Sequence, residues 1–202
     1  MAQKPQFRYD RDGRVRSFFQ LQAEYASDDI DRFREHVELE RARRLTTARK
    51  RASNIPSGMG EFLADEAQEL DTVSYLADEL SIVALYRVVE INTARIVAYE
   101  FGPTFKTKAS YIARLKKLLR ERKGIALDKV PHYEAINELR LLNNAIKHAG
   151  EVTEELANAY PRWHKGGRLT GLDKAYKRLR PKVPIYILRL AERMDLRYKS
   201  PT

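Results

Sequence analysis

Apolar residues along this chain recur at intervals of three and four, the spacing that places side chains on one face of a helix. The first such stripe consists of Ile30, Phe33 and Val37 and predicts a helix from about residue 28 to residue 52. The segment 1–27 mixes aromatic and charged residues, so we expect an irregular N-terminal arm there.

A second helical region is predicted over residues 59–100. Its second half is apolar nearly all round, which is typical of a central, buried helix. Glu90 interrupts this apolar surface, where a carboxylate is costly unless it is paired. Arg87 lies one turn earlier and would neutralise it. The alternative is that Glu90 orients catalytic side chains of another helix.

Three further helical regions complete the predicted fold. The third covers about 106–122. The fourth covers about 131–148 and is closed by Gly150, a residue suited to the end of a helix. The last runs from about 172 to 197. The prediction is therefore an all-α bundle of about five helices, folded as a single domain over residues 28–200.

Composition and charge narrow the possible functions. The formal net charge is +10, which favours a polyanionic partner such as RNA or DNA, although many basic proteins have none. The chain has no cysteine, which excludes disulfides, Cys-ligated zinc and a cysteine nucleophile and fits a cytoplasmic location. No stretch approaches 18 uncharged apolar residues, so we expect no membrane span.

The third predicted helix is dense in cations, and within it only Glu121 opposes them. Such a surface contacts phosphates and releases their counterions. The predicted RNA-binding residues in and beside this helix are Lys106, Lys108, Lys116, Lys117, Arg120 and Arg122. The same helix is the candidate recognition element in an alternative interpretation as a DNA-binding protein, although its flanking turns do not suggest a helix-turn-helix.

The fourth predicted helix carries a polar stripe opposite Leu139, Leu142 and Ile146. A histidine on this stripe could transfer protons near neutral pH, and its cations could stabilise charge on a phosphate. The alternative is that the cations at the helix end only complement the helix dipole. The candidate catalytic residues on this stripe are Arg140, Asn144, Lys147 and His148.

Two other features carry weaker signals. The remaining histidines are isolated from each other and from paired carboxylates, so neither a metal site nor a cofactor is predicted. The loop around Trp163, His164 and Lys165 has two interpretations: it stacks on a nucleic-acid base, or it is a packed anchor of the fold.

The segment Ile136 to Gly150, preceded by an apolar helix and a basic helix, resembles the HEPN family of small helical domains. Ribonucleases of that family carry an Arg, then four to six residues, then a His, often with an Asn directly after the Arg. With His148 as the histidine, Asn144 takes the Asn position and Asn143 takes the Arg position. Arg140 lies one turn earlier on the same face.

The resemblance implies a HEPN-like bundle and, for an active member, a metal-independent endoribonuclease of a defence or toxin–antitoxin system. His148 would act as general acid and base, Arg140 or Lys147 would hold the phosphate, and Asn143 would support them. It also implies a homodimer whose fourth helices meet across a cleft, and it raises the possibility of a cognate protein partner. The main alternative is a non-catalytic helical interaction or regulatory module.

Overall fold

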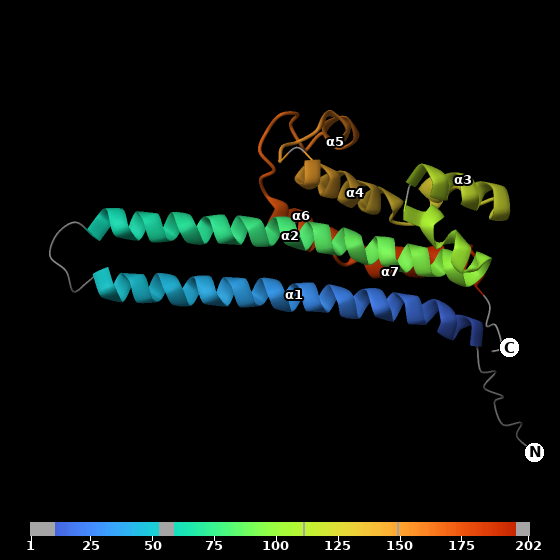
Figure 1. The fold of residues 1–202 in the computed structure, drawn as a ribbon, viewed down its shortest axis with the longest axis horizontal. Helices are drawn as coiled ribbons and strands as arrows, with labels where there is room; N and C mark the ends of the chain where they lie inside the picture. The colour runs from blue at the N-terminus through green and yellow to red at the C-terminus, as the bar shows by residue number, and fades with distance from the viewer. Residues whose placement is uncertain (1–10, 53–58, 111, 149, 197–202) are drawn as a thin grey trace, which may run out of the picture. The chain divides into compact units, whose positions relative to one another are not determined.

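The computed structural model describes residues 11–52, 59–110, 112–148 and 150–196, and most of these residues are helical (Figure 1). The only β feature among them is an isolated bridge between Glu151 and Arg168. The expected all-α class is confirmed. The elements are α1 Arg11–Ala52, α2 Met59–Phe101, the 3-10 helix η1 Pro103–Ser110, α3 Ile112–Lys123, η2 Leu127–Lys129, α4 Tyr133–His148, α5 Glu154–Ala159, α6 Leu172–Leu179 and α7 Lys182–Arg193.

The chain divides into two compact units, each assembled from segments that are far apart in the sequence. Unit 1 takes residues 1–24, 89–133 and 183–202, and unit 2 takes residues 25–88 and 134–182. The sequence predicted one domain. Because α1 and α2 each contribute to both units, no linker or change of composition marks the division.

Helix α1 begins at Arg11, so the irregular arm predicted over 1–27 is wrong for residues 11–27, while residues 1–10 lie outside the described chain. Phe19, Ala23 and Ile30 are buried and lie on one side of this helix, at intervals of four and seven residues. The sequence did not reveal this stripe, because Phe18, Leu21 and Tyr25 beside it are also apolar, although they are exposed in the structure.

Unit 1 packs α3 and α7 with the ends of the two long helices. Phe19 of α1 meets Tyr99 of α2 edge to face, with 6.0 Å between ring centroids. The predicted stripe of α3 is confirmed, since Leu115, Leu118 and Leu119 are buried. The third helix starts later than predicted, because η1 occupies residues 103–110.

Unit 2 is built on an antiparallel pair of helices, α1 from Tyr25 and α2 up to Val88 (Figure 1). Ion pairs join the two helices, including Arg41 to Asp71 at 2.6 Å. Helix α6 attaches to this hairpin through Tyr176, whose hydroxyl donates to Asp31 at 2.7 Å. The buried carboxylate of Glu138 lies in α4 of the same unit.

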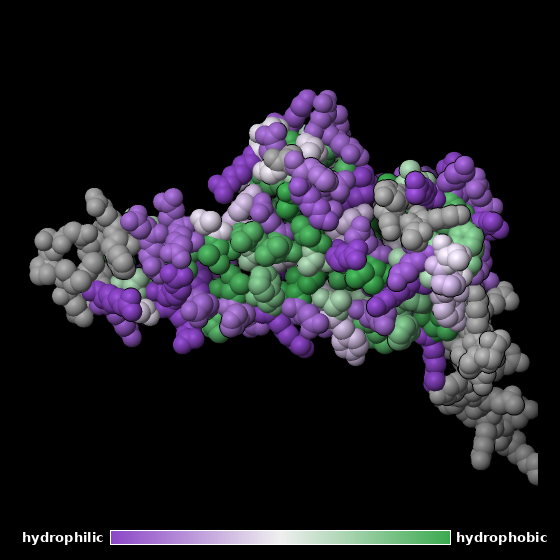
Figure 2. Space-filling view, in the orientation of Figure 1, coloured by the Kyte–Doolittle hydropathy of each residue, from purple (hydrophilic) through white to green (hydrophobic). Residues whose placement is uncertain are grey.

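The α1–α2 hairpin of unit 2 leaves large apolar side chains exposed, and Figure 2 shows apolar residues gathered along its middle. Exposed apolar patches of this kind often mark interaction surfaces. None of the described helices is long and apolar enough to cross a membrane. The exposed residues are Tyr25, Phe33 and Leu39 of α1 and Val73, Leu76 and Leu80 of α2.

Candidate functional site on helix α4

Helix α4 is amphipathic, as predicted. Leu139 and Leu142 are fully buried, and so is Ala145. The helix closes at Gly150, whose φ is +66° and whose amide donates to the carbonyl of Ala145 at 2.9 Å. A positive φ favours glycine at this position. The fold thereby places the polar stripe of α4 opposite the core.

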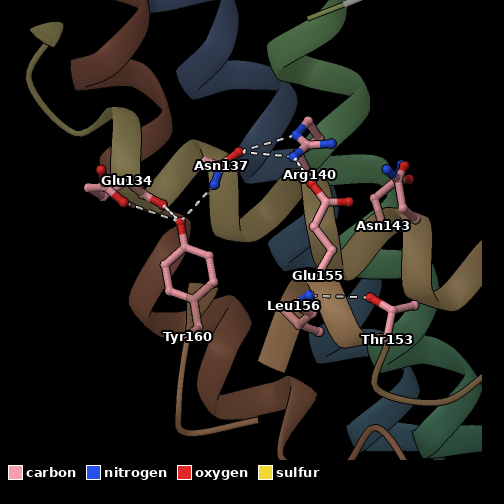
Figure 3. Close-up of polar contacts among 9 residues, drawn as sticks. Glu134, Asn137, Arg140, Asn143, Thr153, Glu155, Leu156 and Tyr160 are labelled. Atoms are coloured by element: carbon pink, nitrogen blue, oxygen red, sulfur yellow. Dashed lines mark hydrogen bonds and ion pairs between the residues drawn. The ribbon is translucent and has the colours of Figure 1, made fainter. Parts of the chain in front are cut away.

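Arg140 is held by its neighbours rather than free (Figure 3). Its Nε and Nη2 both donate to Oδ1 of Asn137 at 3.2 Å, and Nη2 also donates to Oε1 of Glu155 at 2.9 Å. Only 17% of the Arg140 side chain is exposed. The guanidinium is therefore partly neutralised, and it points toward the carboxylate of α5.

The other three candidate catalytic residues lie at the end of α4. Lys147 and His148 are exposed, and Asn144 is half-buried. Arg140 precedes His148 by about two helical turns, which separates their backbones by roughly 12 Å along the axis. Asn144, Lys147 and His148 therefore lie together at the C-terminal end of α4. Arg140 lies about two turns earlier and pairs with Glu155.

Two residues were predicted to support the catalytic groups. Asn143 is buried and its Nδ2 donates to Oδ1 of Asn144 at 3.4 Å, while its own Oδ1 has no hydrogen-bond partner among the described residues. Figure 3 shows Asn143 apart from the Arg140 network. Glu90 is half-buried in the part of α2 that belongs to unit 1, whereas α4 from Glu134 onward belongs to unit 2.

Tyr160, which the sequence did not link to the fourth helix, belongs to the α4 network (Figure 3). The hydroxyl of Tyr160 donates to the backbone carbonyl of Glu134 at 2.7 Å and accepts from Nδ2 of Asn137 at 3.2 Å. Burial raises the pKa of Tyr160 above its usual range. This side chain therefore serves as a neutral hydrogen-bonding group that fixes Asn137, and through it Arg140.

Glu138 is the most buried acid among the described residues of unit 2, and nothing in the sequence pattern predicted its burial. The residue is 2% exposed. Its carboxylate accepts from Nε1 of Trp163 at 2.9 Å and from both terminal nitrogens of Arg178, at 2.7 and 2.9 Å. Trp163 itself is 8% exposed. The packed-anchor interpretation of the Trp163 loop fits this arrangement.

The predicted RNA-binding cations belong to unit 1. Those with described side chains are all exposed, while the side chain of Lys108 lies outside the described part. Lys117 pairs weakly with Glu121 at 3.8 Å, where both side chains are mostly exposed. Most of this charge is therefore available to solvent. The exposed cations of the prediction are Lys106, Lys116, Lys117, Arg120 and Arg122.

Comparisons of the chain with protein-family models, with curated proteins and with solved structures find no match.

Proposed function

We propose that this chain is a HEPN-like helical module that binds RNA through the basic surface of α3 and does not cleave it. The observation that supports this most is the exposure of the α3 cations. Lys116, Lys117 and Arg120 are exposed on a helix that carries a single acid, Glu121. Surfaces of this kind bind phosphate backbones mainly by counterion release.

The geometry of α4 favours binding over cleavage. A transition state with extra negative charge needs a cation aimed at the same point as the general acid. Arg140 is instead committed to Asn137 and Glu155, and it lies about two turns from His148. The HEPN resemblance of α4 favours RNA over DNA as the polyanion.

The test is a direct comparison of RNA affinities by fluorescence anisotropy with a labelled single-stranded RNA. The variant Lys116→Glu, Lys117→Glu, Arg120→Glu should bind at least about tenfold more weakly than the wild type. The matched control Arg32→Glu, Arg43→Glu, Lys177→Glu changes the net charge equally at three exposed positions of unit 2. Equal losses of RNA affinity in both variants would show that only the net charge matters and would contradict RNA binding by α3.

Metal-independent RNA cleavage is the second candidate, favoured by the exposure of His148 beside Lys147 at the end of α4. In this alternative His148 transfers the protons and Lys147 holds the phosphate. Total RNA incubated with the wild type in EDTA would be cut, and His148→Ala would lower cleavage about a hundredfold or more. Intact RNA with the wild type would exclude this candidate.

A homodimer is also part of the proposal. The described polar face of α4 offers little apolar area, whereas Leu76 and Leu80 of α2 are exposed. Burial of apolar surface drives most association. We therefore assign the interface to the hairpin rather than to the α4 face.

A further inference from the structure

Unit 2 contains a cavity of about 540 Å³ between the Trp163 loop and α6. Its volume lies within the usual range of small-molecule sites, about 300–1,000 Å³. Val152, Trp163 and Ala175 supply apolar lining. The charged and titratable side chains that line it are Arg162, His164, Arg168, Lys174 and Arg178.

The loop that carries this lining is fixed by its backbone. Val152 exchanges two hydrogen bonds of 2.9 Å with the glycine pair, donating to the carbonyl of Gly167 and accepting from the amide of Gly166. The amide of Gly167 donates to the carbonyl of His164 at 3.0 Å, and a Cβ at Gly167 would lie only 3.0 Å from that oxygen. The tight turn therefore favours glycine at position 167 and holds His164 beside the cavity.

The charge of the cavity is one-sided. No carboxylate lines it within the described chain. Glu138, which contacts Trp163 and Arg178 of the lining, is buried and already bound by both of them. Arg162 approaches the same carboxylate only at 3.8 Å and is more than half exposed. The lining therefore carries four permanently charged cations, and the buried Glu138 is hydrogen-bonded to one of them, Arg178.

Two of those cations, Arg168 and Lys174, keep their charge, and neither forms an ion pair with a carboxylate within the described chain. The guanidinium carbon of Arg168 lies 4.4 Å from the centre of the Tyr75 ring, a contact that orients the group and keeps its charge. Lys174 is exposed on α6, where the neighbouring Asp173 pairs with Lys177 instead, at 3.9 Å. A multiply charged anion in the cavity would meet both groups.

We propose that this cavity binds a phosphomonoester, the dianionic group of a nucleoside monophosphate or of a phosphorylated RNA end. Arginine forks match the geometry of phosphate oxygens, and lysine adds a point charge. The aromatic and apolar lining suits the organic part of such a ligand. The site does not depend on RNA binding by α3, because the α3 cations belong to unit 1.

The chain has one tryptophan, and it lines the cavity, so its fluorescence reports on occupancy. Titration with AMP at constant ionic strength should give a saturable change, checked by calorimetry on the same protein. Lys174→Gln should weaken AMP binding about tenfold, the size expected for a lost charged hydrogen bond. The matched control Lys177→Gln, on the same helix but outside the cavity, should bind AMP as the wild type does.

Three further ligands separate the sources of the phosphate. Adenosine should bind at least tenfold more weakly than AMP. Tighter binding of a 5′-phosphorylated RNA trinucleotide than of AMP would identify an RNA end as the ligand, and equal binding would identify a free nucleotide. The 5′-hydroxyl trinucleotide should bind weakly in both cases. Absence of AMP binding by both methods, or equal affinities for Lys174→Gln and Lys177→Gln, would overturn the proposal.

Discussion

The indole nitrogen of Trp163 donates a hydrogen bond of 2.9 Å to the carboxylate of Glu138, 25 residues earlier in the chain. The same carboxylate accepts hydrogen bonds from both terminal nitrogens of Arg178. One buried acid thus joins α4, the Trp163 loop and α6. Such an arrangement fixes geometry more than it adds net stability, since the charges lose hydration when they are buried. It also holds one wall of the basic cavity in place.

Removing this charge should destabilise unit 2. In Glu138→Gln the amide cannot neutralise Arg178, whose side chain is only 32% exposed. We expect the free energy of unfolding in urea to fall by about 2–3 kcal/mol, below the range for a fully buried pair because water reaches Arg178 in part. The control Glu121→Gln, in an exposed pair on α3, should lose less than about 0.5 kcal/mol. Similar losses in both variants would contradict the central role of Glu138.

Tyr176 should make stability depend on alkaline pH. Burial, followed by its hydrogen bond to Asp31, raises the pKa of Tyr176 above its usual value of about 10. The folded state therefore holds this proton more tightly than the unfolded chain does. Its contribution is complete below about pH 10 and is lost as pH rises further.

The measurement is the difference in unfolding free energy between the wild type and Tyr176→Phe across pH. Near neutral pH the variant should be less stable by about 1 kcal/mol, the value of one hydrogen bond. Above about pH 10 the gap should close or reverse, because only the wild type loses the Tyr176 contribution. A gap that stays constant to pH 11 would show that the hydroxyl is not held in its neutral form.

The hairpin assignment of the dimer interface is tested by sedimentation velocity at micromolar concentration. Leu76→Glu with Leu80→Glu puts two charges on the exposed apolar stripe of α2 and should convert the dimer to a monomer without loss of helix signal. Lys147→Glu on the α4 face should leave the dimer intact. A monomeric wild type would refute the dimer, and dissociation by Lys147→Glu alone would move the interface to α4.

Much of the helical fold could be predicted from periodicity, because the stripes of α3 and α4 are regular. Leu118 and Leu139 lie where their spacing placed them. The start of α1 could not be predicted, because the sequence does not show which of several neighbouring apolar residues are buried and which are exposed. Phe18 is exposed while its neighbour Phe19 is buried.

The candidate site was harder to predict than the helix that carries it. The spacing predicted an amphipathic α4, but it did not predict the partner of Arg140, since Glu155 comes from a short helix that the sequence did not suggest. Glu138 was missed for a similar reason. In the sequence Glu138 looks like a surface acid, because its partner Arg178 lies 40 residues later in the chain.

The salt dependence of RNA binding tests the central claim most directly. For single strands the logarithm of the affinity falls with the logarithm of salt concentration by about 0.7 for each phosphate contacted. Replacing Lys116, Lys117 and Arg120 with glutamate should reduce this slope by about 2 while the protein stays folded, and the control Arg32→Glu, Arg43→Glu, Lys177→Glu should keep the wild-type slope. An unchanged slope in the α3 variant, or a wild type whose RNA affinity does not depend on salt, would contradict RNA binding by α3.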